Sequence, residues 1–214
     1  MSLTLQAVAP DRRTDMALTD ERVSLDWLQL DDLLNRAANA LNGLDLHERR
    51  VAVFAPNSAE TVIAYVACLE AGISSVPVSF HLTPSEAAYI LKDSGAVALL
   101  VGPETMEAGL AAATEAGVAT VIGWRCPDRD GMIHWEAWLA AASTAEPDPS
   151  VAPLPHLHYT SGTTGRPKAT ETPPQYFPRV ATVQALAETV RARITPSPGI
   201  AVGPLYHTGP LGMA

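Results

Sequence analysis

Residues 51–78 read VAVFAPNSAETVIAYVACLEAGISSVPV, and this stretch decides the expected fold. The run Val51–Ala55 is short and apolar, which is typical of a buried strand. A helix is expected to begin after Ser58, a good N-cap residue, and to end at Gly72. The next strand follows at Ile73–Val78. A strand, a helix and a second strand in this order predict a parallel pair joined by a right-handed crossover.

The same alternation continues to residue 122. Residues Thr83–Glu86 have the pattern of a capping box, with proline at the first helical position, and predict a helix that ends near Ser94. Strands are expected at Ala96–Val101 and Val118–Ile122, with a helix over Glu104–Ala116 between them. The predicted fold class is therefore α/β, a layered, Rossmann-like parallel sheet with helices on both faces.

The flanking segments predict further elements and a domain boundary. Ala17–Val23 indicates a short strand or a hairpin, and Asp26–Leu41 has apolar residues at helical spacing. Four prolines within Ala145–Pro155 are typical of a linker. We therefore expect a first α/β domain over residues 1–150 and a second, incomplete domain over residues 151–214. The elements expected beyond the linker are a strand at His156–Tyr159, a helix at Arg179–Arg193 and a strand at Ile200–Leu205.

Composition restricts the class of partner. The net charge of −9 argues against a nucleic-acid surface, which needs clustered basic residues. The two cysteines, Cys68 and Cys126, are too few for a disulfide framework or a metal site. The most apolar stretch, Val62–Val78, is interrupted by charged and helix-breaking residues and is too short to span a membrane. We expect a cytoplasmic protein, while peripheral contact with a membrane remains open.

Residues 159–169 read YTSGTTGRPKA and form the most chemically specific segment. Glycines let the backbone N–H groups surround an anion, hydroxyls add donors, and a lysine adds charge. A Walker A loop is excluded, because Pro167 stands where its second glycine is required. A solvent-exposed linker is the alternative, but it gives no reason for Gly-Arg-Pro-Lys after the hydroxyl run. The residues expected to bind phosphate are Thr160, Ser161, Gly162, Thr163, Thr164, Gly165 and Lys168.

This loop resembles the phosphate-binding signature of the adenylate-forming (AMP-binding) superfamily, which includes acyl-CoA synthetases, luciferases and the adenylation domains of peptide synthetases. Residues 69–78 and 82–94 are also similar to segments of that family. The resemblance implies the N-terminal domain of the acyl-CoA synthetase fold. It implies an enzyme that joins a carboxylic acid to AMP and then passes the acyl group to CoA. ATP, Mg²⁺ and CoA are the implied cofactors, and we expect the Mg²⁺ and CoA sites outside this chain.

Residues 204–209 read PLYHTG and resemble the acyl-pocket motif of the family. Amino-acid-activating relatives usually carry an aspartate in this motif, whereas acyl-CoA synthetases and luciferases carry a histidine. His207 therefore favours a carboxylic acid without an α-amine, such as a fatty acid, although a structural role for this histidine is the alternative. The resemblance implies Lys168 and His207 as catalytic residues. Lys168 would stabilise the charge on departing pyrophosphate, and His207 would lie beside the carboxylate.

Other conspicuous side chains favour structural roles. His156 and His158 point to one side of the expected strand, as a metal pair would, but a third ligand is not evident, and we predict no metal site. Tyr159 is expected to pack beside the loop. The tryptophans expected in the core are Trp124, Trp135 and Trp138.

The resemblance also implies that this chain contains only part of a family member. Family members that act as enzymes are more than twice as long, so we expect a truncated chain: a fragment, a deliberate shortening or the product of an interrupted gene. Alone it should be inactive, and its exposed faces should favour self-association. A non-catalytic nucleotide-binding or interaction module is the alternative. Ala169 replaces a usual glycine, which is tolerable unless that position needs a positive φ.

Overall fold

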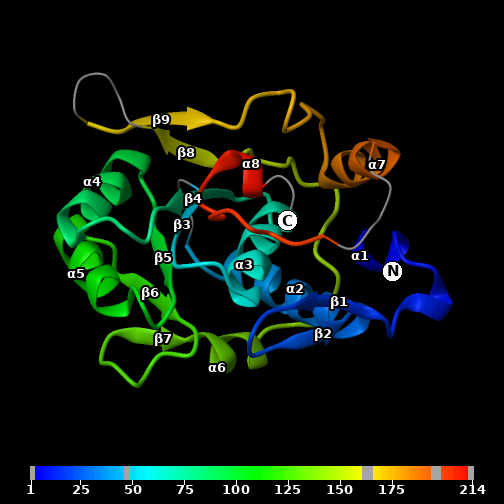
Figure 1. Ribbon diagram of the computed structural model, residues 1–214, viewed down its shortest axis with the longest axis horizontal. Helices are drawn as coiled ribbons and strands as arrows, with labels where there is room; N and C mark the ends of the chain where they lie inside the picture. Colours follow the sequence, from blue (N-terminus) through cyan, green and yellow to red (C-terminus); the bar gives the residue numbers. More distant parts are fainter. Residues whose placement is uncertain (1–2, 46–48, 161–165, 194–198, 212–214) are drawn as a thin grey trace.

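A five-stranded parallel sheet forms the centre of the molecule (Figure 1). The computed structural model describes residues 3–45, 49–160, 166–193 and 199–211. The strand order is β4-β3-β5-β6-β7, and each neighbouring pair is parallel. The strands are β3 (Arg50–Phe54), β4 (Ser74–Val78), β5 (Ala98–Val101), β6 (Thr120–Gly123) and β7 (Met132–His134). The predicted α/β fold is confirmed.

The helices between these strands begin and end where the capping residues predict. The Ser58 hydroxyl accepts a hydrogen bond from the amide of Thr61 at the start of α3 (Ala59–Glu70). Thr83 and Glu86 form both halves of a capping box on α4 (Pro84–Ser94), which ends at Gly95 in the left-handed conformation. The next helix, α5 (Met106–Ala116), ends in the same way at Gly117. These caps satisfy backbone groups that a helix end leaves unpaired.

Strands β3, β5 and β6 have buried apolar side chains on both faces. Val51 and Val53 pack into one cluster with α2 (Trp27–Asn42), α3 and α6 (Trp135–Ala140). Ala52 and Phe54 pack into a second cluster with α4 and α5 on the opposite face (Figure 1). The tryptophans are in the first cluster, as predicted: Trp124 and Trp135 are buried, and Trp138 is partly buried. Each large apolar side chain buried in this way contributes about 1.5–3 kcal/mol.

The upstream segment is a hairpin. Strands β1 (Met16–Thr19) and β2 (Ser24–Asp26) are antiparallel. Asp20, in the turn, accepts a hydrogen bond from the amide of Ala59 at the start of α3. Arg125 lies 2.9 Å from Asp20 and 2.7 Å from Glu60, and its side chain is largely buried. This ion triad attaches the hairpin to the sheet.

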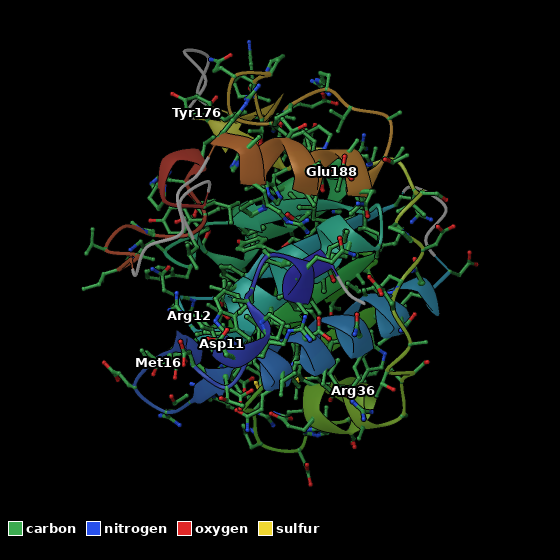
Figure 2. All side chains as sticks on the ribbon, turned by 90° about the vertical axis from the view of Figure 1, so that its right-hand side faces the viewer. Asp11, Arg12, Met16, Arg36, Tyr176 and Glu188 are labelled. Atoms are coloured by element: carbon green, nitrogen blue, oxygen red, sulfur yellow. The ribbon has the colours of Figure 1, made fainter. Side chains whose placement is uncertain are left out.

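Short elements at the edges of the fold were not predicted. They are α1 (Leu3–Gln6), a 3-10 turn at Pro10–Arg12, β7 and α6. Arg36 on α2 lies beside α6 (Figure 2) and donates to the carbonyl of Ala142 at 3.2 Å. Such elements are too short for a hydrophobic period to reveal, because their position depends on tertiary contacts.

The part of the chain beyond residue 150 adds further strands and helices and contributes Leu205 to the first apolar cluster. It contains β8 (Leu157–Thr160), β9 (Lys168–Glu171), α7 (Val183–Arg193) and α8 (Thr208–Leu211). Segment 145–155 has no helix or strand. The division into domains at residue 150 stays a prediction. Within the described ranges, we find no helix long and apolar enough to cross a membrane.

The strand predicted at Ile200–Leu205 is wrong. Ile200 and Val202 are 87% and 91% exposed, and only Leu205 reaches the core. The Asn57 side chain replaces a strand partner, because it donates to the carbonyl of Gly203 and accepts from the amide of Leu205, both at 2.9 Å. A side chain thus satisfies the backbone groups that a neighbouring strand would otherwise bond.

Candidate phosphate and acyl site

Strands β8 and β9 form the two sides of the predicted phosphate loop. They pair antiparallel, with Thr160 opposite Lys168 and Tyr159 opposite Ala169. Thr160 and Lys168 are therefore brought together at the end of the pair where the loop begins, and both are exposed. The other predicted phosphate ligands, Ser161, Gly162, Thr163, Thr164 and Gly165, lie outside the described residues. The hydroxyl and the ammonium group can bind an anion between them.

Strand β9 was not predicted. Its residues Lys168–Glu171 are polar and exposed, so they show neither an apolar run nor a buried face. Ala169 lies within this extended strand and is not among the described residues with positive φ. The alanine is therefore accommodated without backbone strain.

Helix α4 contacts both sides of the loop. The Tyr159 hydroxyl donates to the Asp93 carboxylate at 2.8 Å, and the Tyr89 hydroxyl donates to the carbonyl of Pro167 at 3.2 Å. The guanidinium of Arg166 lies 5.5 Å from the centre of the Tyr89 ring, a cation–π distance. Burial, followed by the interaction with Asp93, raises the pKa of Tyr159. The expected packing role of Tyr159 agrees with these contacts.

Tyr89 and Asp93 contact the two sides of the loop, and sequence reasoning missed both. They lie four residues apart on α4, and this spacing places them on one helix face. Their spacing was visible in the sequence, but their partners were not, because Tyr159 and Pro167 lie more than 60 residues further along the chain.

The opposite face of β8 carries the two histidines. His156 Nδ1 lies 2.6 Å from the Ser75 hydroxyl, and its ring contacts Tyr65 edge-on with ring centres 5.9 Å apart. Burial, with His158 nearby, lowers the pKa of His156 to about 4, so this imidazole is neutral near pH 7. Within the described ranges, no group of three or more His, Cys, Asp and Glu side chains could hold a metal ion.

The acyl motif folds back toward β8 (Figure 1). His207 lies in the turn before α8, is exposed, and its ring centre is 4.5 Å from that of Tyr206. Tyr206 in turn packs edge-on against Phe80, at 5.5 Å between ring centres. Burial lowers the pKa of His158, with a smaller contribution from His207 in the same direction. The structure thus brings His207 near His158 on β8, which lies two residues before Thr160.

The chain belongs to the AMP-binding enzyme family, whose pattern it matches over residues 5–213. It is 35% identical over 70% of its length to phosphinothricin tripeptide synthetase PhsB of Streptomyces viridochromogenes, and covers 12% of that protein. It is 33% identical over 67% of its length to indoleacetate–CoA ligase of Aromatoleum aromaticum, and covers 29% of that protein.

Similarity to solved structures agrees with this membership. ATP-bound MatB of Rhodopseudomonas palustris superposes on 98% of the chain with a TM-score of 0.69 and 25% identity. The match covers 41% of the MatB chain. The chain therefore spans less than half the length of these relatives, which include both a peptide synthetase and a CoA ligase.

Proposed function

We propose that this chain is the part of an ATP-dependent acyl-CoA synthetase that carries the phosphate loop and the acyl motif. The observation that carries the proposal is the pairing of Thr160 with Lys168 at the base of the loop, with His207 folded back toward the same strand. The exposed ammonium group and hydroxyl fit a phosphate chain chemically. The substrate is a carboxylic acid, of fatty type, and the enzyme is cytoplasmic.

In the first half-reaction, a carboxylate oxygen bonds to the α-phosphorus of ATP while the bond from that phosphorus to the leaving oxygen breaks. The products are acyl-AMP and pyrophosphate. Lys168 and the hydroxyl and amide groups of residues 160–165 bind the β- and γ-phosphates and stabilise the charge that develops on the leaving group. In the second half-reaction, the CoA sulfur bonds to the acyl carbonyl carbon, the bond from that carbon to the AMP oxygen breaks, and the thiol proton passes to solvent.

Mg²⁺ would neutralise phosphate charge, and CoA would accept the acyl group. Within the described part of the chain, no cluster of His, Cys, Asp and Glu side chains could hold a metal ion by itself. Mg²⁺ and CoA are included in this proposal only because the family uses them. Lys168 requires neither to bind a phosphate oxygen, because an ammonium group donates up to three hydrogen bonds.

His207 decides the class of acid. An α-amino acid brings an ammonium group into the site, and that group needs a carboxylate partner when it is partly desolvated. An imidazole cannot supply this negative charge. We therefore propose that simple carboxylic acids are activated and α-amino acids are rejected, even though PhsB is among the relatives.

Binding of nucleotide by this chain tests the phosphate assignment. Isothermal titration should give weak binding of ATP and weaker binding of AMP, because the β- and γ-phosphates supply the contacts. Lys168→Ala should remove most of the difference. Lys92→Ala is the matched control, since it removes the same charge from an exposed position on α4 and should leave ATP binding unchanged. Equal affinity for ATP and AMP would contradict the assignment.

Activity of a full-length parent tests the chemistry. Lys168→Ala should slow acyl-AMP formation about 100- to 1,000-fold and leave thioester formation from preformed acyl-AMP nearly unchanged. Pyrophosphate exchange across a panel of acids should respond to fatty or aromatic acids. Exchange driven preferentially by an α-amino acid would overturn the role given to His207.

Self-association is a further part of the proposal. Ile200 and Val202, two residues apart in the sequence, expose large apolar side chains, which favours contact between copies of the chain. Replacing both with serine should reduce the sedimenting mass at high concentration. A wild-type chain that sediments as a monomer at every concentration would contradict it.

A further inference from the structure

Strand β9 lacks the apolar packing that holds the strands of the sheet. All four of its residues are exposed, including Lys168, so no buried side chain of its own fixes this strand. A two-stranded pair by itself is marginally stable at best in water. The start of β8 is held to β4 by the Ser75 hydroxyl, which lies 2.6 Å from His156 Nδ1. This contact lies at the far end of β8 from Thr160, the partner of Lys168, and does not fix the lysine.

Helix α4 contacts the chain directly before Lys168. The Tyr89 hydroxyl donates to the carbonyl of Pro167 at 3.2 Å. This carbonyl belongs to the planar peptide group that joins Pro167 to Lys168, so the hydrogen bond orients the backbone at the lysine. The centre of the same tyrosine ring lies 5.5 Å from the guanidinium of Arg166. One side chain of α4 therefore contacts both residues that precede Lys168.

The same helix also holds the strand opposite Lys168. Asp93 accepts a hydrogen bond of 2.8 Å from the Tyr159 hydroxyl. Tyr159 pairs with Ala169, the residue directly after the lysine. Lys168 thus lies between a backbone carbonyl that Tyr89 bonds and a strand pair that Asp93 bonds.

Helix α4 is itself firmly held. Its opposite face packs into the second apolar cluster through the buried residues Ala87, Ala88, Ile90 and Leu91. A capping box closes its start, and left-handed Gly95 closes its end. Tyr89 and Asp93 lie about one turn apart on the face toward the β8–β9 pair. Side chains on a well-packed helix hold a site more precisely than side chains on a loop.

We propose that Tyr89 and Asp93 are positioning residues for Lys168, which fix the backbone on both sides of the lysine so that its ammonium group is preorganised for a phosphate. That Lys168 binds phosphate rests on the proposed function, whereas the placement of its backbone by α4 does not. Neither Tyr89 nor Asp93 needs to contact the nucleotide. The groups required are a hydroxyl on the ring of residue 89 and a hydrogen-bond acceptor at residue 93.

The first test measures amide hydrogen exchange in this chain without nucleotide. Tyr89→Phe removes one hydroxyl and keeps the ring beside Arg166. The amides of β9 should exchange about 3- to 10-fold faster, because the loss of one hydrogen bond favours local opening by about that factor, while the amides of β3 and β5 stay unchanged. Tyr176→Phe is the matched control, since it removes the same atom from a tyrosine that is 66% exposed and lies beyond β9. Amides of β9 that exchange equally fast in wild type and Tyr89→Phe would overturn the proposal.

The second test compares Asp93→Ala with Asp93→Asn by titrating each variant of this chain with ATP. Alanine should weaken ATP binding about 3- to 10-fold, because it removes the acceptor for the Tyr159 hydroxyl. Asparagine should bind ATP at least as tightly as wild type, since its side-chain oxygen still accepts this hydrogen bond. A carboxylate that acted only through its charge would repel phosphate, and both variants would then bind ATP more tightly. Tighter or unchanged ATP binding in Asp93→Ala would contradict the proposal.

The third test asks whether Tyr89 acts through Lys168 in a full-length parent. Tyr89→Phe should slow acyl-AMP formation about 3- to 10-fold and leave thioester formation from preformed acyl-AMP unchanged. In the Lys168→Ala background, the same substitution should have no further effect, because the group that it positions is gone. Equal slowing in both backgrounds would overturn the positioning role.

These readouts separate the two proposals. Faster exchange of β9 in Tyr89→Phe, in a chain that does not bind ATP, would leave the placement of Lys168 by α4 intact and overturn the proposed function. ATP binding that depends on Lys168 but is equal in wild type, Tyr89→Phe and Asp93→Ala would overturn the positioning role alone. If Asp93→Ala fails to fold, Tyr89→Phe and Asp93→Asn still decide, because asparagine with weakened ATP binding contradicts the proposal.

Discussion

The parallel sheet and the β8–β9 pair differ in what holds their strands in place. Every residue of β4 and β5 is buried, whereas all four residues of β9 are exposed. Apolar packing on both faces fixes the sheet strands. Lys168 is instead placed by its register with β8 and by the contacts of α4 with both sides of the loop. Apolar burial therefore holds the sheet strands, whereas strand pairing and polar contacts hold β9, whose side chains are exposed.

The largest effect should come from the sheet. Leu100 lies on β5, between β3 and β6, and is fully buried. Leu100→Ala should lower the free energy of unfolding by about 2–5 kcal/mol, because it removes apolar contacts and leaves a cavity. Denaturant unfolding followed by circular dichroism measures this.

Thr170→Ala on exposed β9 is the matched control and should change the free energy of unfolding by no more than about 0.5 kcal/mol. If the two substitutions cost the same, the proposed contrast between the sheet and the β8–β9 pair is wrong.

A smaller effect is expected from the polar attachment of the hairpin to the sheet. Burial acts to raise the pKa of Asp20, but hydrogen bonds from the amides of Ala59, Arg22 and Val23 and from Arg125 outweigh it and hold the pKa below its usual range. Asp20→Asn should cost about 1–3 kcal/mol above pH 5, because it removes the charge that these donors stabilise.

The sign of the pH effect follows from the lowered pKa. Stability from the Asp20 carboxylate is present above its unfolded pKa near 3.8 and is lost as the pH falls through the folded value. Wild type should therefore approach the asparagine variant in acid. Asp15→Asn, which breaks only an exposed pair with Arg12, should change stability by about 1 kcal/mol or less. Equal losses in both variants would show that the triad adds nothing beyond a surface ion pair.

Two buried titratable groups, one in each region, should make the free energy of unfolding depend on pH in opposite directions. The pKa of His156 on the β8 side is lowered from 6.5 to about 4, so its stabilising neutral form is fully present above pH 6.5 and its contribution is lost as the pH falls toward 4. Burial, and then Asp31 and Glu146, raise the pKa of Glu70 at the end of α3 to about 7, against a hydrogen bond from Thr4. Its contribution is full below about pH 4.5 and is lost as the pH rises through 7.

Thermal unfolding from pH 4 to pH 8 checks the predictions for His156 and Glu70. His156→Gln should flatten the fall in stability on the acid side, because glutamine can still bond Ser75 without taking up a proton. Glu70→Gln should flatten the fall on the alkaline side. Slopes unchanged by either substitution would show that these groups titrate as they do in the unfolded chain.

The comparison also explains which features the sequence could predict. Burial leaves a pattern in the residues themselves, so the strands β3–β6, the caps at Ser58 and Thr83 and the core tryptophans were all predictable. Strand β9 and the contacts of Tyr89 and Asp93 were not, because exposed polar residues show no period and their partners are distant in sequence. The strand predicted at Ile200–Leu205 is wrong because its backbone bonds a residue that is distant in sequence. Asn57 bonds the backbone of Gly203 and Leu205 in place of a neighbouring strand.

The smallest effect on the free energy of unfolding is expected at Ala169, which lies in β9 close to the predicted phosphate loop. If the loop required backbone freedom here, Ala169→Gly should tighten ATP binding. The alanine instead lies in extended β9 opposite Tyr159, where glycine offers no conformational advantage and loses more entropy on folding. We therefore expect Ala169→Gly to lower the free energy of unfolding by about 0.5–1 kcal/mol and to leave ATP binding unchanged. Titration calorimetry and denaturant unfolding of the same preparation check both halves. A glycine variant that binds ATP more tightly would mean that backbone freedom at residue 169 contributes to phosphate binding.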